Sequence, residues 1–326
     1  MSARLEKTIA RVRQRIADGQ FYEAHQALRT VAARYVKAED YDQAIELLFH
    51  GARELLVAGQ GGSGGDLASY MITTYKSAKV PVDTTSKARA VLLFNLFHPE
   101  EPRRKEFVHD VIQWSATGTV PYGDPELFHI IGTAYANEDL PYDAEKMLLL
   151  GTKDSAAVLA QLLYDWSAED PDVELAPFYI SRAVLGYLTV GNIRDARHAL
   201  DVFISRLVAS PRLTPLAPAV RVVSTASGGE LNVFPDLPLL NFFDLLIRSC
   251  QRRSPDMFRR LRFRYKSVIS DAGAFDEALD RIGDVFFGIK VRNQGNILQD
   301  LMGSLFSGGS QGPAPRTPQI QGADMD

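Results

Sequence analysis

The chain has 326 residues, of which 46% are hydrophobic and 23% are charged, a composition that is ordinary for a folded soluble protein. Its formal net charge of −4 does not favour binding to nucleic acid or to an acidic membrane surface. The single cysteine, Cys250, excludes an internal disulfide and a cysteine-rich zinc site. Residues 1–16 lack the apolar core of a secretory signal, and no apolar run approaches the roughly 18–20 residues of a membrane span. We therefore expect a cytosolic or nuclear protein.

Helical periodicity begins at the N-terminus. Apolar residues recur three or four positions apart in three successive segments, Ile9–Ile16, Phe21–Tyr35 and Tyr41–Leu55. Gly19 separates the first two segments, and the glycine-rich run Gly59–Gly65 is predicted to end the third as an interhelical loop.

Further amphipathic segments follow that loop. Asp66 or Asp83 is suited to cap the next helices, and Asp124 before Pro125 indicates an N-cap followed by proline in the first helical position. The predicted helices are 67–78, 84–97, 103–115, 126–137, 144–150, 155–167, 175–190 and 193–208.

A short signature recurs at helix starts: a large apolar residue is followed three positions later by alanine. The large side chain fills a groove between helices and the alanine lets a neighbouring helix approach, as in tetratricopeptide repeats. Buried helix starts in general show this pattern too, so the prediction also rests on chain length and short turns. We predict an all-α, right-handed α-solenoid of divergent tetratricopeptide-like helix hairpins. The segments are Phe21–Ala24, Tyr41–Ala44, Ile193–Ala196, Phe275–Ala278 and, as a weaker copy, Pro141–Ala144.

Residues 211–238 interrupt the helical pattern, because five prolines exclude a regular helix there. Val220–Thr225 and Glu230–Phe234 flank a Ser-Gly-Gly turn and predict one β-hairpin inserted in the C-terminal half, near 220–234. Such a hairpin must pack against something, since an isolated one is marginal in water. Helices are predicted to resume at 239–250, 257–270, 275–287 and 297–306, and the tail 307–326 is predicted to be disordered.

The chain offers little that would support catalysis. Gly59–Gly64 matches G-x-G-x-x-G, but it follows a helical pattern where a dinucleotide site requires a strand. The histidines have no partners at metal-ligand spacing. Cys250, at the end of an apolar helix, fits a small buried hydrophobe. We expect no enzyme activity, no cofactor and no metal.

Two polar stripes lie on the first two helices. Clustered cations steer association with acidic partners, which makes these stripes a candidate docking face. An ordinary solvated helix face would show the same periodicity, so both interpretations stay open. The first stripe consists of Lys7, Arg11 and Arg15, and the second of Tyr22, His25 and Arg29.

A denser basic cluster lies between Arg248 and Lys266. RNA binding is conceivable there, but no aromatic platform motif accompanies the cluster, and arginine stems commonly cover apolar helix surfaces. The neighbouring segments Leu237–Ile247 and Asp280–Gly288 are unusually apolar. We expect these two segments to form either the end cap of the solenoid or a groove for a partner segment.

Several strings resemble the Golgi to ER traffic protein four family, in the family's order and over about residues 5–306. They are Gly19–Thr30, Trp114-Ser115, Pro238–Asn241, Asp280–Gly283 with Phe286–Gly288, and Leu301–Ser304.

The resemblance implies a cytosolic scaffold that helps to deliver tail-anchored proteins to the endoplasmic reticulum. It implies that the N-terminal half, residues 1–150, docks on the targeting ATPase, and that the C-terminal half, residues 151–306, holds a ubiquitin-like-domain adaptor. Neither nucleic acid nor direct membrane insertion is expected. The alternative is a generic solenoid adaptor in another assembly, such as a proteasome-lid-like or RNA-processing complex.

The resemblance also suggests which residues bind each partner. For the ATPase, Tyr22, His25 and Arg29 fall in the matching motif, and the charge stripe adds Arg11 and Arg15. For the adaptor, the candidates are Val222, Val233, Phe234, Leu239, Leu240, Phe242, Phe243, Leu246, Phe286 and Phe287.

Overall fold

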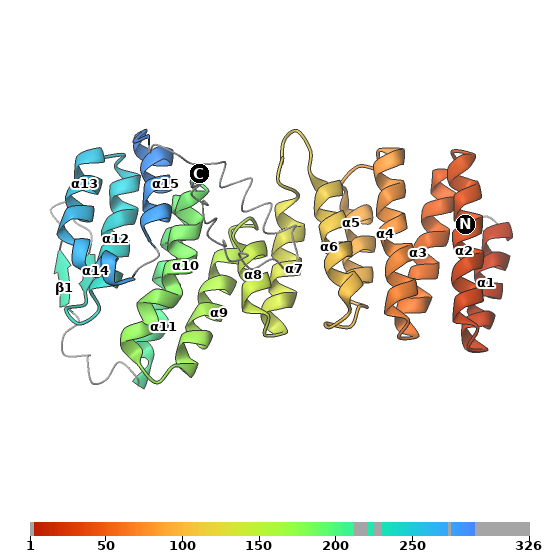
Figure 1. Cartoon of the computed structure of the whole chain (residues 1–326), viewed down its shortest axis with the longest axis horizontal. Coiled ribbons are helices and arrows are strands. Elements are labelled where there is room, and N and C mark those ends of the chain that lie inside the picture. Colours follow the sequence, from red (N-terminus) through yellow and green to blue (C-terminus); the bar gives the residue numbers. More distant parts are fainter. Residues whose placement is uncertain (1–2, 212–220, 225–229, 273–274, 291–326) are drawn as a thin grey trace, which may run out of the picture.

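The computed structural model describes residues 3–211, 221–224, 230–272 and 275–290. Helices stand side by side along the long axis of the molecule, with α1 at one end and α12–α15 at the other (Figure 1). Successive helices pack together, and several also contact the helix two positions further on, such as α2 with α4 and α9 with α11. This is the nearest-neighbour packing of a helical solenoid.

The helices before residue 150 are α1 (Ala3–Ala17), α2 (Phe21–Lys37), α3 (Tyr41–Val57), α4 (Gly61–Ala78), α5 (Thr84–Phe94), α6 (Pro102–Ser115), α7 (Pro125–Asn137) and α8 (Pro141–Leu148). After residue 150 come α9 (Ser155–Glu169), the short 3₁₀ turn η1 (Val173–Leu175), α10 (Ala176–Thr189), α11 (Ile193–Ala209), strands β1 (Arg221–Ser224) and β2 (Glu230–Val233), α12 (Pro238–Gln251), α13 (Pro255–Arg264), α14 (Lys266–Ala272) and α15 (Asp276–Phe287).

Four of the five alanines of the recurring signature have the packing role that the sequence predicted, whereas Ala278 is only half-buried. Ala24, Ala44, Ala144 and Ala196 have no exposed surface, because a neighbouring helix lies directly over each of them. The turns before these helices are tight, and the one at Gly19 is in the left-handed region, where glycine is unstrained. The predicted cap at Asp124 is also confirmed: its carboxylate accepts hydrogen bonds from the backbone N–H groups of residues 126 and 127.

The prediction that the glycine-rich run Gly59–Gly65 forms a loop was wrong. Helix α4 already begins at Gly61. A Cβ on Gly64 would lie 2.7 Å from Leu56 Cγ, and one on Gly65 would lie 2.8 Å from Arg103 Cβ. These glycines therefore allow α3 and α6 to approach α4 closely. Packing outweighs the low helix propensity of glycine, which costs about 1 kcal/mol per residue. Asp66 consequently lies inside α4 and does not cap it.

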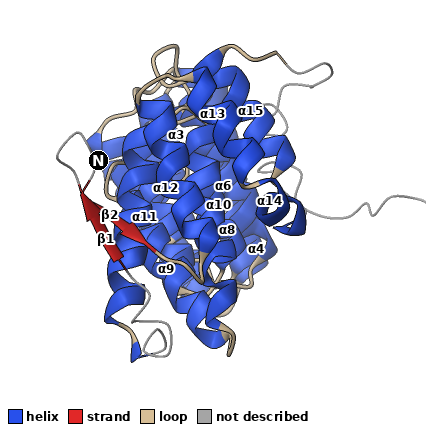
Figure 2. Cartoon of the chain, turned by 90° about the vertical axis from the view of Figure 1, so that its left-hand side faces the viewer, coloured by secondary structure: helices blue, strands red, loops and turns tan. Residues whose placement is uncertain are grey.

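The predicted β-hairpin inserted near 220–234 needs a correction in its extent, because the described residues there form two strands of four residues each and the rest of the described chain is helical or loop. Helices α11 and α12 contact each other directly, so the helical array continues from one to the other. β1 and β2 are four-residue strands that pair antiparallel with each other, from Arg221 opposite Val233 to Ser224 opposite Glu230. They lie at the outer edge of the helices (Figure 2). The predicted turn, residues 225–229, lies outside the described residues.

Two further differences concern the C-terminal helices. The predicted helix 257–270 is divided into α13 and α14, with Tyr265 between them. The predicted helix 297–306 and the predicted disordered tail 307–326 lie outside the described residues.

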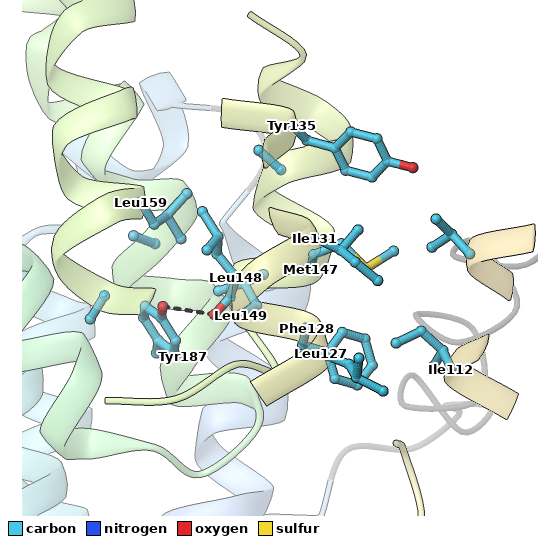
Figure 3. Close-up of a cluster of buried hydrophobic side chains, with 14 of the residues drawn as sticks. Ile112, Leu127, Phe128, Ile131, Tyr135, Met147, Leu148, Leu149, Leu159 and Tyr187 are labelled. Atoms are coloured by element: carbon cyan, nitrogen blue, oxygen red, sulfur yellow. Dashed lines mark hydrogen bonds between the residues drawn. The ribbon is translucent and has the colours of Figure 1, made fainter. Parts of the chain in front are cut away.

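The apolar core runs along the array from α1 to α15. Figure 3 shows the part around α7 and α8, where Phe128 and Ile131 lie beside Leu148 and Met147. The buried Tyr187 hydroxyl donates a 3.0 Å hydrogen bond to the Leu148 carbonyl oxygen, which ties α10 to α8. The packing is therefore continuous across residue 150.

Ion pairs between helices of neighbouring repeats accompany this core. In Arg104–Glu138, Arg182–Glu145 and Arg197–Asp244 the partners are 34, 37 and 47 residues apart, which is about one helix pair. Arg13–Glu54, Arg29–Asp66, Arg89–Glu46, Lys87–Glu126 and Lys105–Asp143 belong to the same series.

Candidate partner-binding surfaces

The first candidate surface lies where α2 faces α4. Asp66 projects from α4, and its Oδ2 lies 2.8 Å from His25 Nε2 and also accepts a hydrogen bond from the Arg29 guanidinium. That guanidinium lies 5.8 Å from the centre of the Tyr70 ring, within cation–π range. Tyr22, one turn before His25, is 70% exposed. Asp66 thus holds His25 and Arg29 of the α2 stripe in place, and Tyr22 at one end of the stripe is open to solvent.

The electrostatics of this cluster favour the charged forms of Asp66 and Arg29. Burial by itself would raise the pKa of Asp66, but hydrogen bonds from Arg29 and His25 outweigh burial and lower it below its usual value. The same hydrogen bond from Arg29 to Asp66 raises the pKa of the guanidinium. Part of the Arg29 charge is therefore already neutralised within the chain.

The structure does not bring the two predicted ATPase-binding stripes into one patch. Arg11 lines a cavity of about 430 Å³ between α1 and α2, together with Lys7, Arg34 and Tyr35. Since an α-helix has 3.6 residues per turn, positions 34 and 35 of α2 lie on the side away from positions 22, 25 and 29. Arg15 is exposed one turn further along α1. The N-terminal end thus carries two separate basic surfaces.

The predicted adaptor-binding residues mostly belong to the core of the last repeats. Phe243 packs 5.9 Å from Phe275, and Phe287 stacks on Phe258 at 4.8 Å between ring centres. Val233, Phe286 and Phe287 are half-buried, and the side chain of Val222 lies outside the described residues. Fully buried are Phe234, Leu239, Leu240, Phe242, Phe243 and Leu246. A partner at this end would first meet the half-buried residues.

Two exposed features were not singled out from the sequence as binding residues. Phe263 on α13 is 83% exposed and lies among the arginines of the second basic cluster. The second feature spans residue 150: Trp166 contacts Tyr142 and Tyr179 edge to face, and the Arg182 guanidinium lies over the rings of Tyr142 and Trp166. A large aromatic residue at the polar position of a helical period was the available signal for Phe263.

The described residues contain no group of three or more histidine, cysteine or acidic side chains that could hold a metal ion. Among them, no helix combines the length and apolarity that crossing a membrane requires. Cys250 is fully buried, and burial raises the pKa of its thiol to about 12.

Comparison with known proteins gives consistent matches. The profile of the family "Golgi to ER traffic protein 4" matches residues 38–306. A relative of that name from Aspergillus fumigatus is 48% identical, with 98% of this chain and 95% of the relative covered. The relative from Schizosaccharomyces pombe is 35% identical over 94% of this chain and 96% of its own. A crystal structure described as that of C. therm. Get4 has a TM-score of 0.80 and 42% identity, covering 96% of this chain and 100% of that one.

Proposed function

Since the chain belongs to the Golgi to ER traffic protein 4 family, we propose that it is a non-enzymatic scaffold bridging the ATPase that targets tail-anchored proteins to a ubiquitin-like-domain adaptor. The family places the chain in Golgi-to-ER traffic. In this proposal it works in the cytosol, where residues 1–150 dock on the ATPase and residues 151–306 hold the adaptor.

The observation that carries the proposal is the fixed stripe on α2. Asp66 pre-orders His25 and Arg29, so binding does not have to immobilise two free side chains. The exposed Tyr22 beside them is a residue type that often dominates interface energies. Arg11 and Arg15 add charge on the neighbouring surface and speed the encounter with an acidic partner.

Calorimetric titration with the purified ATPase tests this assignment. Because Tyr22 is exposed, Tyr22→Ala leaves the fold intact, and we expect ATPase binding to weaken by about tenfold or more, as for an interface hot spot. Arg15→Glu should weaken binding as well, with an effect that shrinks as salt is added. Arg29→Ala removes the contact with Asp66 and should also weaken ATPase binding.

Arg260→Glu is the matched control, because it makes the same charge change on the exposed α13 at the other end of the array. It should leave ATPase affinity unchanged. Equal losses of ATPase affinity for Arg15→Glu and Arg260→Glu would mean that net charge alone causes the effect. Unchanged ATPase affinity for Tyr22→Ala and Arg15→Glu would reject the docking face.

The adaptor half of the proposal is tested by co-purification with the N-terminal region of the adaptor. The half-buried Val233, Phe286 and Phe287 are accessible members of the predicted set, and the buried members hold the surface in shape. Phe286→Ala should reduce recovery of the adaptor without changing ATPase binding. Recovery of proteasome subunits or RNA from lysate, without targeting factors, would favour the alternative assembly.

A further inference from the structure

Phe263 is an apolar side chain that the last repeats leave in solvent, with 83% of its surface exposed. It lies on α13, at the end of the array opposite to α1 (Figure 1). Phe258 and Leu261 of the same helix are buried, and α13 packs on α12, α14 and α15. Since each residue turns an α-helix by about 100°, Phe263 points away from both buried residues and therefore away from the core.

Cations flank Phe263 on this outer face of α13. Arg259 and Arg260 precede it by one helical turn and share its side of the helix. The Arg259 guanidinium lies 3.4 Å from the Asp256 carboxylate, and both side chains are largely exposed. The other exposed cations at this end make no side-chain hydrogen bond or ion pair with another described residue. They are Arg252, Arg253, Arg260, Arg264 and Lys266.

We propose that the outer face of α13 binds the surface of an anionic lipid bilayer. A cluster of about four to eight Lys or Arg residues on a helix is typical of binding to acidic lipid headgroups. An apolar side chain among such cations enters the boundary between headgroups and acyl chains. The guanidinium groups pair with lipid phosphates, and the Phe263 ring enters that boundary. The contact is peripheral, and it is local, because the chain as a whole has a net charge of −4.

Two features of this face favour a bilayer over RNA or an acidic protein segment. Single-stranded RNA stacks its bases on several aromatic side chains, but the other aromatic residues of α13 and its C-cap face the core. Phe258 is buried, and Tyr265 packs 5.5 Å from Phe242. A protein segment docks in a groove or along a sheet edge, whereas the outer side of a single helix is convex. Projecting side chains on a convex face match the flat surface of a bilayer.

The outer face of α13 is separate from the candidate adaptor surface. Phe287 stacks on Phe258 at 4.8 Å between ring centres, which places it on the buried side of the helix. Phe263 lies on the opposite side. The membrane contact therefore does not depend on the proposed bridging role, and each is tested without the other.

Co-sedimentation of the full chain with vesicles tests the proposal. Vesicles of phosphatidylcholine and phosphatidylserine are compared with vesicles of phosphatidylcholine alone, and binding should require phosphatidylserine and weaken as salt is added. Phe263→Ser and Arg260→Glu should each weaken binding by about fivefold or more, through the loss of apolar contact and of charge. Asp256→Asn should strengthen binding by about twofold or more, because it removes an acid that competes with lipid phosphate for Arg259. A misfolded variant would not give such a gain.

Arg53→Glu and Val57→Ser on α3 are the matched controls. There too an exposed cation and an apolar side chain, 64% exposed, lie one turn apart. Both variants should leave vesicle binding unchanged. A loss for Arg53→Glu equal to that for Arg260→Glu would mean that net charge alone drives binding and would overturn the proposal. Equal binding with and without phosphatidylserine would overturn it as well, and so would binding of an RNA oligonucleotide through Phe263 in place of vesicles.

Discussion

The buried guanidinium of Arg104 gives the sharpest test of how the repeats are held together. Arg104 is 2% exposed, and it donates two hydrogen bonds to Glu138, at 2.5 and 2.7 Å. It also lies 4.3 Å from the centre of the Phe94 ring and 5.2 Å from that of Tyr135. The cation is therefore removed from water and depends on one carboxylate and two aromatic faces.

Removing the carboxylate should cost more than removing the cation. Glu138→Ala leaves a buried charge without its partner, and we expect unfolding free energy to fall by about 3–5 kcal/mol. Arg104→Met keeps a long apolar stem against Phe94 and leaves Glu138 partly exposed to solvent. Replacing a buried ion-pair member by an apolar side chain of similar length costs less, so we expect a loss of about 1–3 kcal/mol.

Urea unfolding followed by circular dichroism measures both values. Arg103→Met is the matched control, because the neighbouring Arg103 is exposed and pairs with Glu106 at the surface, where such pairs contribute about 0–1 kcal/mol. A loss for Arg104→Met equal to or larger than that for Glu138→Ala would refute the reasoning. It would mean that the aromatic contacts, and not the buried charge, dominate this site.

Three further outcomes follow from the structure. The pKa of Asp66 is lowered in the folded chain, so its stabilising effect should be complete above its unfolded pKa and lost as pH falls through the folded value. The difference in unfolding free energy between the parent and Asp66→Asn should therefore shrink on acidification, which unfolding measured at several pH values checks. Gly132→Ala should destabilise by about 1–3 kcal/mol, because its Cβ would lie 2.8 Å from Leu148 Cγ, whereas Gly62→Ala in open space should stabilise by about 0.4–1 kcal/mol; thermal unfolding compares them. The buried thiol of Cys250 should react with a thiol reagent only after denaturant is added, and rapid reaction of the native chain would contradict its burial.

The sequence was informative where a local rule and tertiary packing agree. The alanine signature predicted which positions neighbouring helices cover, and Ala24 and Ala196 are fully buried. The cap at Asp124 was predictable because side chain and backbone lie within three residues of each other. Such signals need no knowledge of distant segments.

Local rules failed where a contact made over a long sequence distance decides the conformation. The sequence around Gly64 and Gly65 is typical of a loop, yet both residues lie in a helix, and Leu56 and Arg103 occupy the space that a Cβ would fill. Asp66 looks like a cap, yet it holds Arg29, which lies 37 residues earlier. The burial of Phe242 and Phe243 likewise depends on Tyr265 and Phe275, which lie on either side of α14, so their apolar sequence alone could not separate a core from a groove.

The continuity of the packing constrains how a bridging scaffold can work. Contacts cross residue 150 without a break, since Tyr187 of α10 donates to the Leu148 carbonyl and Leu149 lies against Gly186. The division at residue 150 is therefore a division of proposed binding roles and coincides with no gap in the packing. Because each helix contacts its neighbours and the core runs from α1 to α15, the two ends cannot rotate freely about a linker. Partners bound at the two ends would thus be held at a separation that the array itself sets. On this view the ion pairs between repeats, such as Arg104–Glu138, matter for function through the geometry they maintain between distant surfaces.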